Sequence, residues 1–199
     1  METERERVRE FFAAKAVGWE KRFPDDGPAY AAAVAELGLR AGRSALDVGC
    51  GTGRALPPLR AAVGPAGTVI GADLTPEMLH EATALGRHRS GALIEADSAR
   101  LPLRDACLDA VFAAGLLHHL PDAAAGLREF ARVTRPGGRL ALFHPIGRAA
   151  LAARRGHELH EDDVRAKPNL PPLLTDAGWE LTVYDDSADR YLAVATRVN

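Results

Sequence analysis

The sequence predicts an α/β fold: a doubly wound, mostly parallel sheet with helices on both faces. Strand-like and helix-like segments alternate five times with short links, which is the pattern of parallel strands joined by crossover helices. After the fifth alternation, strand-like segments at 180–184 and 191–196 are separated by a link too short for a crossover helix. These two should therefore pair as an antiparallel hairpin that closes the sheet.

The expected elements follow one another along the chain. A helical pattern covers residues 2–17, turn-forming residues occupy 23–28, and a second helix covers 30–39. The expected strands are 44–48, 67–73, 91–97, 108–114 and 139–144, and the helices are 55–63, 77–85, 122–133 and 171–177. Thr75 is placed to cap the helix at 77–85. We expect one domain, with N-terminal helices at 1–42 forming a lid over a core at 43–199.

Composition excludes several classes of partner. The 199 residues carry a formal net charge of −2 and are 47% hydrophobic, so no global field favours nucleic acid or an anionic membrane. The two cysteines, Cys50 and Cys107, match neither a disulfide framework nor a metal pattern. The first residues lack an apolar signal core, and no run approaches the roughly 18 to 20 apolar residues of a membrane span. We therefore expect a cytoplasmic protein with no membrane or nucleic-acid partner.

A glycine-rich turn at 47–53, with the sequence Asp-Val-Gly-Cys-Gly-Thr-Gly, connects the first core strand to the helix at 55–63. Glycines at 49, 51 and 53 allow φ > 0 and carry no Cβ, so the backbone can turn sharply and approach a ligand closely. The free N–H groups of the following helix face the same ligand. These features predict a nucleotide-like cofactor.

The spacing of the turn discriminates between cofactors. A dinucleotide fingerprint requires G-x-G-x-x-G, but Arg54 stands at the place of its third glycine. Asp47 would repel a pyrophosphate and suits a cationic ligand with N–H donors. The turn resembles the first motif of the class I S-adenosylmethionine-dependent methyltransferases, whose cofactor carries a sulfonium and no phosphate. The resemblance covers roughly residues 43–197 and implies a Rossmann-like fold of the small-molecule methyltransferase type (type 11-like domain).

Three more segments carry this resemblance. Residues 95–103 are similar to an A-D-A-x-x-L-P-F segment, and 108–122 resemble the signature F-D-x-V-x-x-x-x-x-L-H-H-L-x-D. Residues 127–138 match L-x-E-x-x-R-V-x-R-P-G-G, which we interpret as architectural.

The resemblance implies a set of cofactor-binding residues. Asp73, at the end of the second strand, would accept both ribose hydroxyls, with Leu74 and Met78 beside the adenine. Asp97 would bind the adenine amino group, and the backbone of Ser98 a ring nitrogen. The structural alternatives are an acid at a helix N-terminus for Asp73, a core role for Met78 and a turn cap for Asp97. The predicted cofactor site comprises Asp47, Gly49, Cys50, Gly51, Thr52, Gly53, Asp73, Leu74, Met78, Asp97, Ser98, Ala114 and Gly115.

Paired histidines are the candidates for catalysis. His118 and His119 follow the stretch 113–116, which the resemblance places beside the methyl group to be transferred. Either could take a proton from an acceptor hydroxyl or amine. A structural role is favoured, because methyl transfer mainly needs in-line positioning and a base is optional. His157 and His160 lie three residues apart on an expected helix, but they match no ligand spacing, so no metal is expected.

The expected function is metal-independent methyl transfer from S-adenosylmethionine to a small molecule through O, N or C. The chain has no N-P-P-Y or D-P-P-Y tetrapeptide after the fourth strand, which argues against methylation of nucleic-acid bases. Three aromatic residues are expected to fold over the cofactor, to form the acceptor pocket, or only to pack the N-terminal helices on the sheet: Trp19, Phe23 and Tyr30. The apolar residues around Trp19, Leu116, Leu117 and Ile146 favour an apolar acceptor. The alternatives are a non-catalytic cofactor-binding or partner module and a nucleotide-dependent oxidoreductase.

Overall fold

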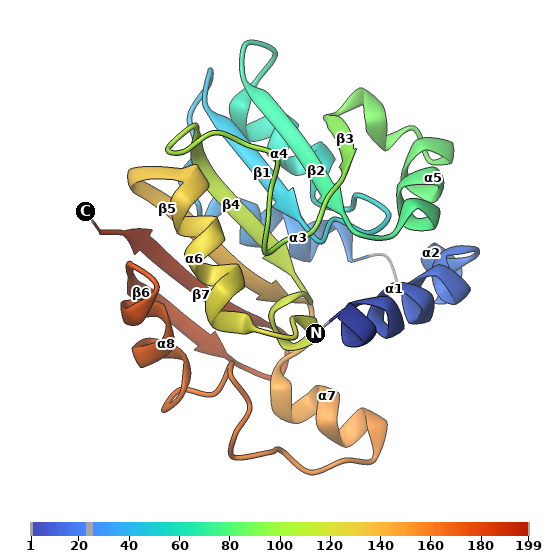
Figure 1. The fold of residues 1–199 in the computed structure, drawn as a ribbon, viewed down its shortest axis with the longest axis vertical. Helices are drawn as coiled ribbons and strands as arrows, with labels where there is room; N and C mark the ends of the chain where they lie inside the picture. The colour runs from blue at the N-terminus through green and yellow to red at the C-terminus, as the bar shows by residue number, and fades with distance from the viewer. Residues whose placement is uncertain (1, 23–25, 199) are drawn as a thin grey trace.

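The computed structural model describes residues 2–22 and 26–198. Its strands form one seven-stranded sheet of order β3-β2-β1-β4-β5-β7-β6 (Figure 1). The strands are β1 Ser44–Val48, β2 Thr68–Asp73, β3 Ala92–Glu95, β4 Leu108–Ala114, β5 Thr134–His144, β6 Trp179–Asp186 and β7 Tyr191–Arg197. Strands β1 to β5 pair in parallel, whereas β7 is antiparallel to both β5 and β6. The predicted sheet with its closing hairpin is confirmed.

Helices cover both faces of the sheet (Figure 1). They are α1 Glu2–Ala16, α2 Trp19–Arg22, α3 Gly27–Ala35, α4 Leu56–Val63, α5 Pro76–Ala84, α6 Ala123–Val133, α7 Arg148–Arg155 and α8 Leu170–Asp176, with 3-10 turns η1 Arg87–Arg89 and η2 Leu117–His119. Successive strand residues point to opposite faces, so Leu46 joins the apolar core under α6 and α8 while Ala45 joins the core under α3 and α4. Two separate cores therefore fix the sheet between its helical layers.

Some boundaries differ from those predicted. Helix α3 begins at Gly27 rather than 30, because Pro28 is well suited to a first helical turn, and it ends at Ala35 before Gly38 reaches a φ of +60°. The Pro-Gly-Gly segment lies inside β5, which pairs irregularly with β4 at this point. Helix α7 was not predicted, and Leu151 is its only buried residue.

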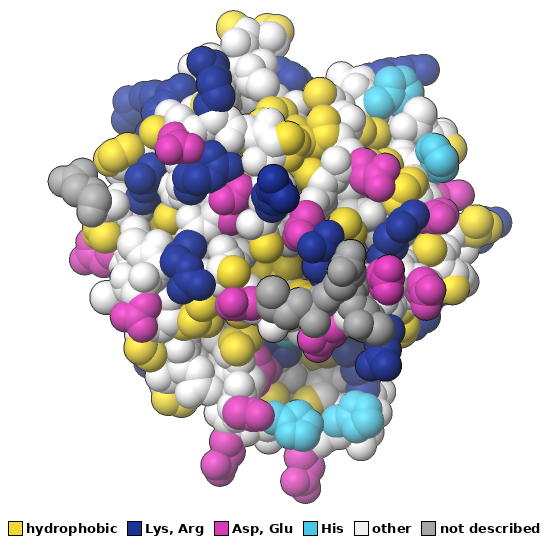
Figure 2. All heavy atoms as spheres, viewed as in Figure 1, with side chains coloured by type: hydrophobic (Ala, Val, Ile, Leu, Met, Phe, Trp, Pro, Cys, Tyr) yellow, Lys and Arg dark blue, Asp and Glu magenta, His cyan; other side chains and the backbone are white. Residues whose placement is uncertain are grey.

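The carboxyl ends of the parallel strands meet at one edge of the sheet. Asp73 pairs with Glu95, and Ala114 pairs with Phe143, so β2 to β5 end nearly level with one another. Helices α1 and α2 lie across this edge beside α5 (Figure 1). Acidic and basic side chains are interspersed over the face drawn in Figure 2. Among the described helices, none has the length and apolar character needed to cross a membrane.

Candidate cofactor and acceptor site

A cavity of about 230 Å³ lies at this edge of the sheet. Every residue predicted for the cofactor lines it except Gly53, and both His118 and His119 line it as well. Gly53 instead serves close packing, because a Cβ there would lie 2.8 Å from Leu56 Cδ1, and its φ is +80°. The cavity therefore gathers residues from the ends of all five parallel strands, and side chains of the N-terminal helices line it as well.

The glycine turn is held against β2 by backbone hydrogen bonds. The N–H of Cys50 donates to the carbonyl of Ala72 at 3.0 Å. Gly49 has φ +65° and a Cβ there would lie 2.8 Å from Leu116 Cδ1, so no other residue fits without a shift. At Gly51, with φ +51°, an added Cβ would meet only Met78 Sδ, at 4.0 Å. The backbone at Gly51 is thus open to a ligand.

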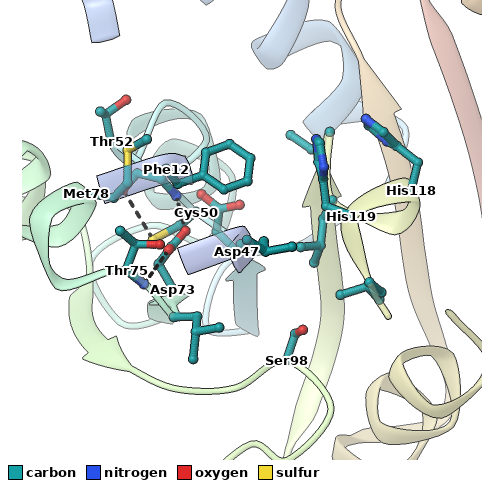
Figure 3. Close-up of a pocket in the computed structure, with 18 of the residues that line it drawn as sticks. Phe12, Asp47, Cys50, Thr52, Asp73, Thr75, Met78, Ser98, His118 and His119 are labelled. Atoms are coloured by element: carbon teal, nitrogen blue, oxygen red, sulfur yellow. Dashed lines mark hydrogen bonds between the residues drawn. The ribbon is translucent and has the colours of Figure 1, made fainter. Parts of the chain in front are cut away.

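Asp73 is fixed by two backbone donors. Its Oδ2 accepts from the N–H of Gly51, and its Oδ1 accepts from the N–H of Thr75, both at 2.8 Å (Figure 3). The predicted side-chain cap of α5 by Thr75 is not formed; instead, the backbone N–H of Thr75 donates to the acid. Burial raises the pKa of Asp73 despite these bonds. A ligand hydroxyl that donates to this carboxylate would be well accommodated.

Asp47 makes the cofactor end of the cavity suited to positive charge. Its side chain is only 2% exposed at the end of β1. Burial, and then the nearby Asp73, raise the pKa of Asp47 well above its ordinary value. A cationic ligand would relieve both effects, whereas a phosphate would worsen them. Burial also raises the pKa of the Cys50 thiol, which therefore stays protonated.

The loop after β3 is tied to two other elements. Asp97 accepts from the N–H of Ala99 at 3.0 Å, so it caps its own turn, and it also pairs with Arg5 of α1 at 3.2 Å. Farther along, the N–H of Leu101 donates to Glu129 Oε1 at 2.6 Å, and Arg132 donates to the carbonyl of Leu101 at 3.1 Å. The motif interpreted as architectural thus holds the loop that presents Asp97.

The N-terminal helices are attached to the glycine turn through Glu20 of α2. Glu20 Oε1 accepts from Thr52 Oγ1 at 2.5 Å and from Arg54 Nε at 3.0 Å. Arg54 also donates to Asp26 Oδ2 at 3.0 Å. Sequence reasoning treated Arg54 only as a departure from a fingerprint, because its partners lie some thirty positions away and no local pattern marks them.

Aromatic side chains from the N-terminal helices line the cavity. Phe12, Trp19 and Tyr30 all do so, whereas Phe23 lies outside the described residues. The ring of Tyr30 packs on Phe143 with centroids 5.1 Å apart, and burial raises the pKa of its hydroxyl. Tyr30 is therefore a neutral hydroxyl at the cavity wall. That residues 1–42 act as a lid stays a prediction.

Three imidazoles lie at the other end of the cavity. The rings of His118 and His119 have centroids 4.0 Å apart, and Phe12 packs edge-on against His119 at 5.1 Å (Figure 3). Burial lowers the pKa of His118 to about 2 and that of His119 to about 4, so both are neutral at pH 7. Among the described residues, His118 Nδ1 is buried without a hydrogen-bond partner. The third imidazole, His144 at the end of β5, also lines the cavity.

Helix α7 bounds the acceptor end and is anchored by a chain of charges. Arg148 donates from its backbone N–H to Asp186 Oδ1 at 2.8 Å and pairs with Asp163 at 3.4 Å, which in turn pairs with Arg165 at 2.9 Å. The side chain of Arg148 is only 10% exposed. This chain positions α7, whose last residue, Arg155, lines the cavity.

The helix expected under His157 and His160 is absent, which corrects that prediction. Helix α7 ends at Arg155, where Gly156 adopts a φ of +69°, and both histidines lie on the exposed segment that follows. Within the described ranges, no group of three or more His, Cys, Asp or Glu side chains is arranged to hold a metal ion.

The parallel sheet, the glycine turn and the closing hairpin define the Rossmann-like class I methyltransferase fold. A family model described as "Methyltransferase domain" matches residues 46–142. This match identifies a domain of the S-adenosylmethionine-dependent methyltransferases at residues 46–142, and S-adenosylmethionine is the cofactor of that family. The residues present fit it, because the cavity combines buried carboxylates with an open glycine backbone.

The chain is also similar in sequence to curated proteins over part of its length. It is 35% identical over 125 residues to demethylmenaquinone methyltransferase of Staphylococcus aureus, covering 60% of this chain and 46% of that protein. The chain spans less than half the length of the first curated relatives it matches.

Solved structures share the whole fold. A SAM-dependent methyltransferase from Aquifex aeolicus superposes with a TM-score of 0.73 at 24% identity, over 94% of this chain and 98% of that chain. Magnesium protoporphyrin IX methyltransferase from Synechocystis PCC 6803, solved with bound SAM, superposes with a TM-score of 0.73 at 20% identity, over 98% and 97% of the two chains.

Proposed function

We propose that this protein transfers a methyl group from S-adenosylmethionine to a small, largely apolar molecule, without a metal ion. One observation carries the proposal: a single cavity joins the buried carboxyl of Asp47, the half-buried carboxyl of Asp73 and an open glycine backbone at one end to imidazoles and aromatic rings at the other. The first end suits a cationic nucleoside and the second suits an apolar acceptor. The cofactor, when bound, supplies an electrophilic methyl group on a sulfonium.

The cofactor end has a role for each predicted residue. Asp73, held by Gly51 and Thr75, would accept from the ribose hydroxyls, and Asp47 would balance positive charge. Met78 and Leu74 would pack beside the adenine, with Asp97 and the backbone of Ser98 at its polar edge. Gly49, Cys50 and Thr52 would shape the turn, and Ala114 and Gly115 would lie beside the methionine moiety.

The acceptor end is mainly apolar. Its lining includes Phe12, Trp19, Leu116, Leu120 and Pro145. The Staphylococcus relative is named demethylmenaquinone methyltransferase, and this likeness supports a small-molecule acceptor. His118 and His119, both neutral, would serve as hydrogen-bonding groups or as bases toward it.

The experiment is calorimetric titration of the purified protein with S-adenosylmethionine, S-adenosylhomocysteine and NADH, followed by a screen of acceptors for methylated product. We expect micromolar binding of the first two ligands, no binding of NADH, and turnover of apolar acceptors. Binding of NADH alone would indicate an oxidoreductase. Cofactor binding without any turnover would indicate a non-catalytic module, and turnover of highly charged acceptors alone would refute the apolar pocket.

A further inference from the structure

We propose that His144 Nε2 is the atom that receives the acceptor's proton, so that the substrate class is a protic nucleophile, a hydroxyl or an amine. The inference rests on the proposed function and deepens it. It assigns the base to β5 rather than to the histidine pair that the sequence singled out.

The tautomer of His144 is set by its own loop. His144 Nδ1 lies 2.9 Å from the carbonyl oxygen of Ile146. A carbonyl oxygen can only accept, so Nδ1 must carry the hydrogen in this contact. The N–H of Ile146 is farther from the same atom, at 3.2 Å, and would require the opposite tautomer. The shorter contact leaves the lone pair on Nε2, which is the acceptor that a base needs.

The ring of His144 is placed beside the proposed methyl position. The N–H of Gly115 donates to the carbonyl of Phe143 at 2.8 Å, which brings the end of β4 against the end of β5. A Cβ added at Gly115 would lie 3.8 Å from His144 Cδ2. Cδ2 is bonded to Nε2, and His144 and Gly115 both line the cavity. The positive φ of Gly115, +64°, favours glycine at this point of the wall.

The other two imidazoles are less well arranged for this task. The rings of His118 and His119 lie in contact at an interplanar angle of 40°, and Phe12 packs edge-on against His119. Among the described residues, Nδ1 of His118 is buried without a partner, so no contact there fixes which nitrogen carries its hydrogen. Within the part of the chain that the structure describes, His144 alone of the three imidazoles has a ring contact with a backbone group that defines its tautomer.

The surroundings of His144 keep its ring neutral. His118 and His119 face it from η2, Arg155 from α7, Arg165 from the loop before α8, and Asp26 from the segment before α3. Burial and the two arginines lower the pKa of His144, while the bond to Ile146 and the charge of Asp26 oppose them. A neutral imidazole is ready to accept a proton at pH 7.

The proton step balances in charge. The lone pair of the acceptor's oxygen or nitrogen forms the new bond to the methyl carbon, and the carbon–sulfur bond breaks with its electron pair remaining on sulfur. The hydrogen of the acceptor passes to His144 Nε2, so the positive charge that began on the sulfonium ends on the imidazolium. His144 then releases this proton to water when the product leaves.

The first test reads the tautomer directly and needs no turnover. Protein labelled with ¹⁵N-histidine is examined by long-range ¹H–¹⁵N NMR with S-adenosylhomocysteine present, and the His144 signals are identified by their loss in His144→Asn. We expect an Nδ1–H ring, neutral at pH 7, whose Nε2 signal shifts when 4-methylphenol is added. An Nε2–H ring, or no shift at saturating phenol, would overturn the proposal.

The second test separates a base from a structural residue. His144→Asn keeps a side-chain donor for the Ile146 carbonyl but removes Nε2, and exposed His157→Asn is the matched control. Two acceptors are compared: 4-methylphenol, which is neutral at pH 8, and 4-nitrothiophenol, which is already ionised. We expect His144→Asn to lower kcat for the phenol at least about 100-fold and for the thiolate less than about threefold.

The outcomes separate this inference from the proposed function. Equal losses for both acceptors would mean that His144 is only structural, and so would a loss of S-adenosylhomocysteine affinity beyond about twofold. If the wild-type protein binds S-adenosylhomocysteine but methylates neither probe, the NMR shift with 4-methylphenol decides the role of His144. If it does not bind S-adenosylhomocysteine at all, the proposed function fails, whatever the tautomer.

Discussion

The two ends of the cavity are built in different ways. At the cofactor end, the shape comes from backbone: the glycine turn, the ends of β1 and β2, and N–H groups that orient Asp73. At the acceptor end, it comes from side chains on segments far apart in sequence, held by charged pairs such as Arg148–Asp186 and Arg54–Asp26. The first end is organised around the glycine turn and neighbouring strand ends, whereas the second depends on contacts between segments far apart in the chain.

This difference predicts how the two ends respond to change. A substitution at the acceptor end should disturb stability and acceptor binding while cofactor affinity is unchanged. A substitution at the cofactor end should lower cofactor affinity while stability and acceptor binding are unchanged. Each prediction below tests that separation.

The largest effect is expected from Gly147→Ala, at the start of α7. A Cβ at Gly147 would lie 1.7 Å from the backbone oxygen of Ser187, so the β6–β7 turn or α7 must move. We expect the free energy of unfolding to fall by about 3 kcal/mol. Urea denaturation measures this change, and the affinity for S-adenosylhomocysteine should stay within about twofold.

Gly156→Ala, at the other end of the same helix, is the control. Gly156 has φ +69° but nothing within 4 Å of an added Cβ, so only backbone strain of about 1 kcal/mol is expected. If Gly147→Ala costs no more than Gly156→Ala, the hairpin turn does not anchor α7.

The next largest effect is expected at the cofactor end. Asp73→Ala removes the acceptor of two backbone N–H groups and of the proposed ribose hydroxyls. We expect cofactor affinity to fall by about 1 to 3 kcal/mol, measured by calorimetry with S-adenosylhomocysteine. Glu95→Ala, on the neighbouring strand β3, is the control and should leave affinity unchanged. An unaltered affinity in folded Asp73→Ala would remove Asp73 from the site.

The same contrast explains what the sequence could and could not predict. Strand β4 and the closing hairpin were predicted closely, because alternation and turn residues are local signals. The glycine turn was recognisable for the same reason, except that Gly53 faces Leu56 rather than the cavity, which only packing decides.

The contacts that hold the acceptor end could not be predicted, because they join residues far apart in the sequence. The partners of Arg54 and Arg148 lie 28 to 38 positions away in several of their bonds, and no periodicity marks such pairs. His144 follows the fifth expected strand, but no motif in the sequence marks it. Its position at the carboxyl end of a parallel strand was the available signal, since ligands gather there.

A smaller loss of folding stability is expected at acidic pH. Burial lowers the pKa of His119 to about 4, below the value near 6.5 of a free histidine, so as pH falls the unfolded chain takes up the proton first. The stability that this ring provides is complete above pH ~6.5 and lost below it. Asp47 and Asp73 oppose this trend, because their raised pKa values favour the folded state in acid.

The histidine contribution is isolated by substitution. Between pH 7 and 5, the wild-type protein should lose up to about 2 kcal/mol more stability than His119→Asn, measured by urea denaturation at each pH. His157→Asn, at an exposed position, should follow the wild type. Parallel losses in all three proteins would show that His119 is not a source of acid sensitivity.

The smallest effect is expected where the two ends are joined, at Glu20. Burial would raise the pKa of this carboxyl, but its bonds to Arg54 and Thr52 hold the pKa below the ordinary value, so the contact is present at neutral pH and lost in acid. Its side chain is 27% exposed and that of Arg54 is 11% exposed, which limits the pair to about 1 kcal/mol.

Glu20→Gln keeps one acceptor for Thr52 and removes the charge. Because this pair connects α2 to the glycine turn, we expect S-adenosylhomocysteine to dissociate about fivefold faster in stopped-flow measurements, with little change in unfolding temperature. Glu10→Gln, exposed on α1, should dissociate at the wild-type rate, and an equal rate in Glu20→Gln would mean that the N-terminal helices do not retain the cofactor.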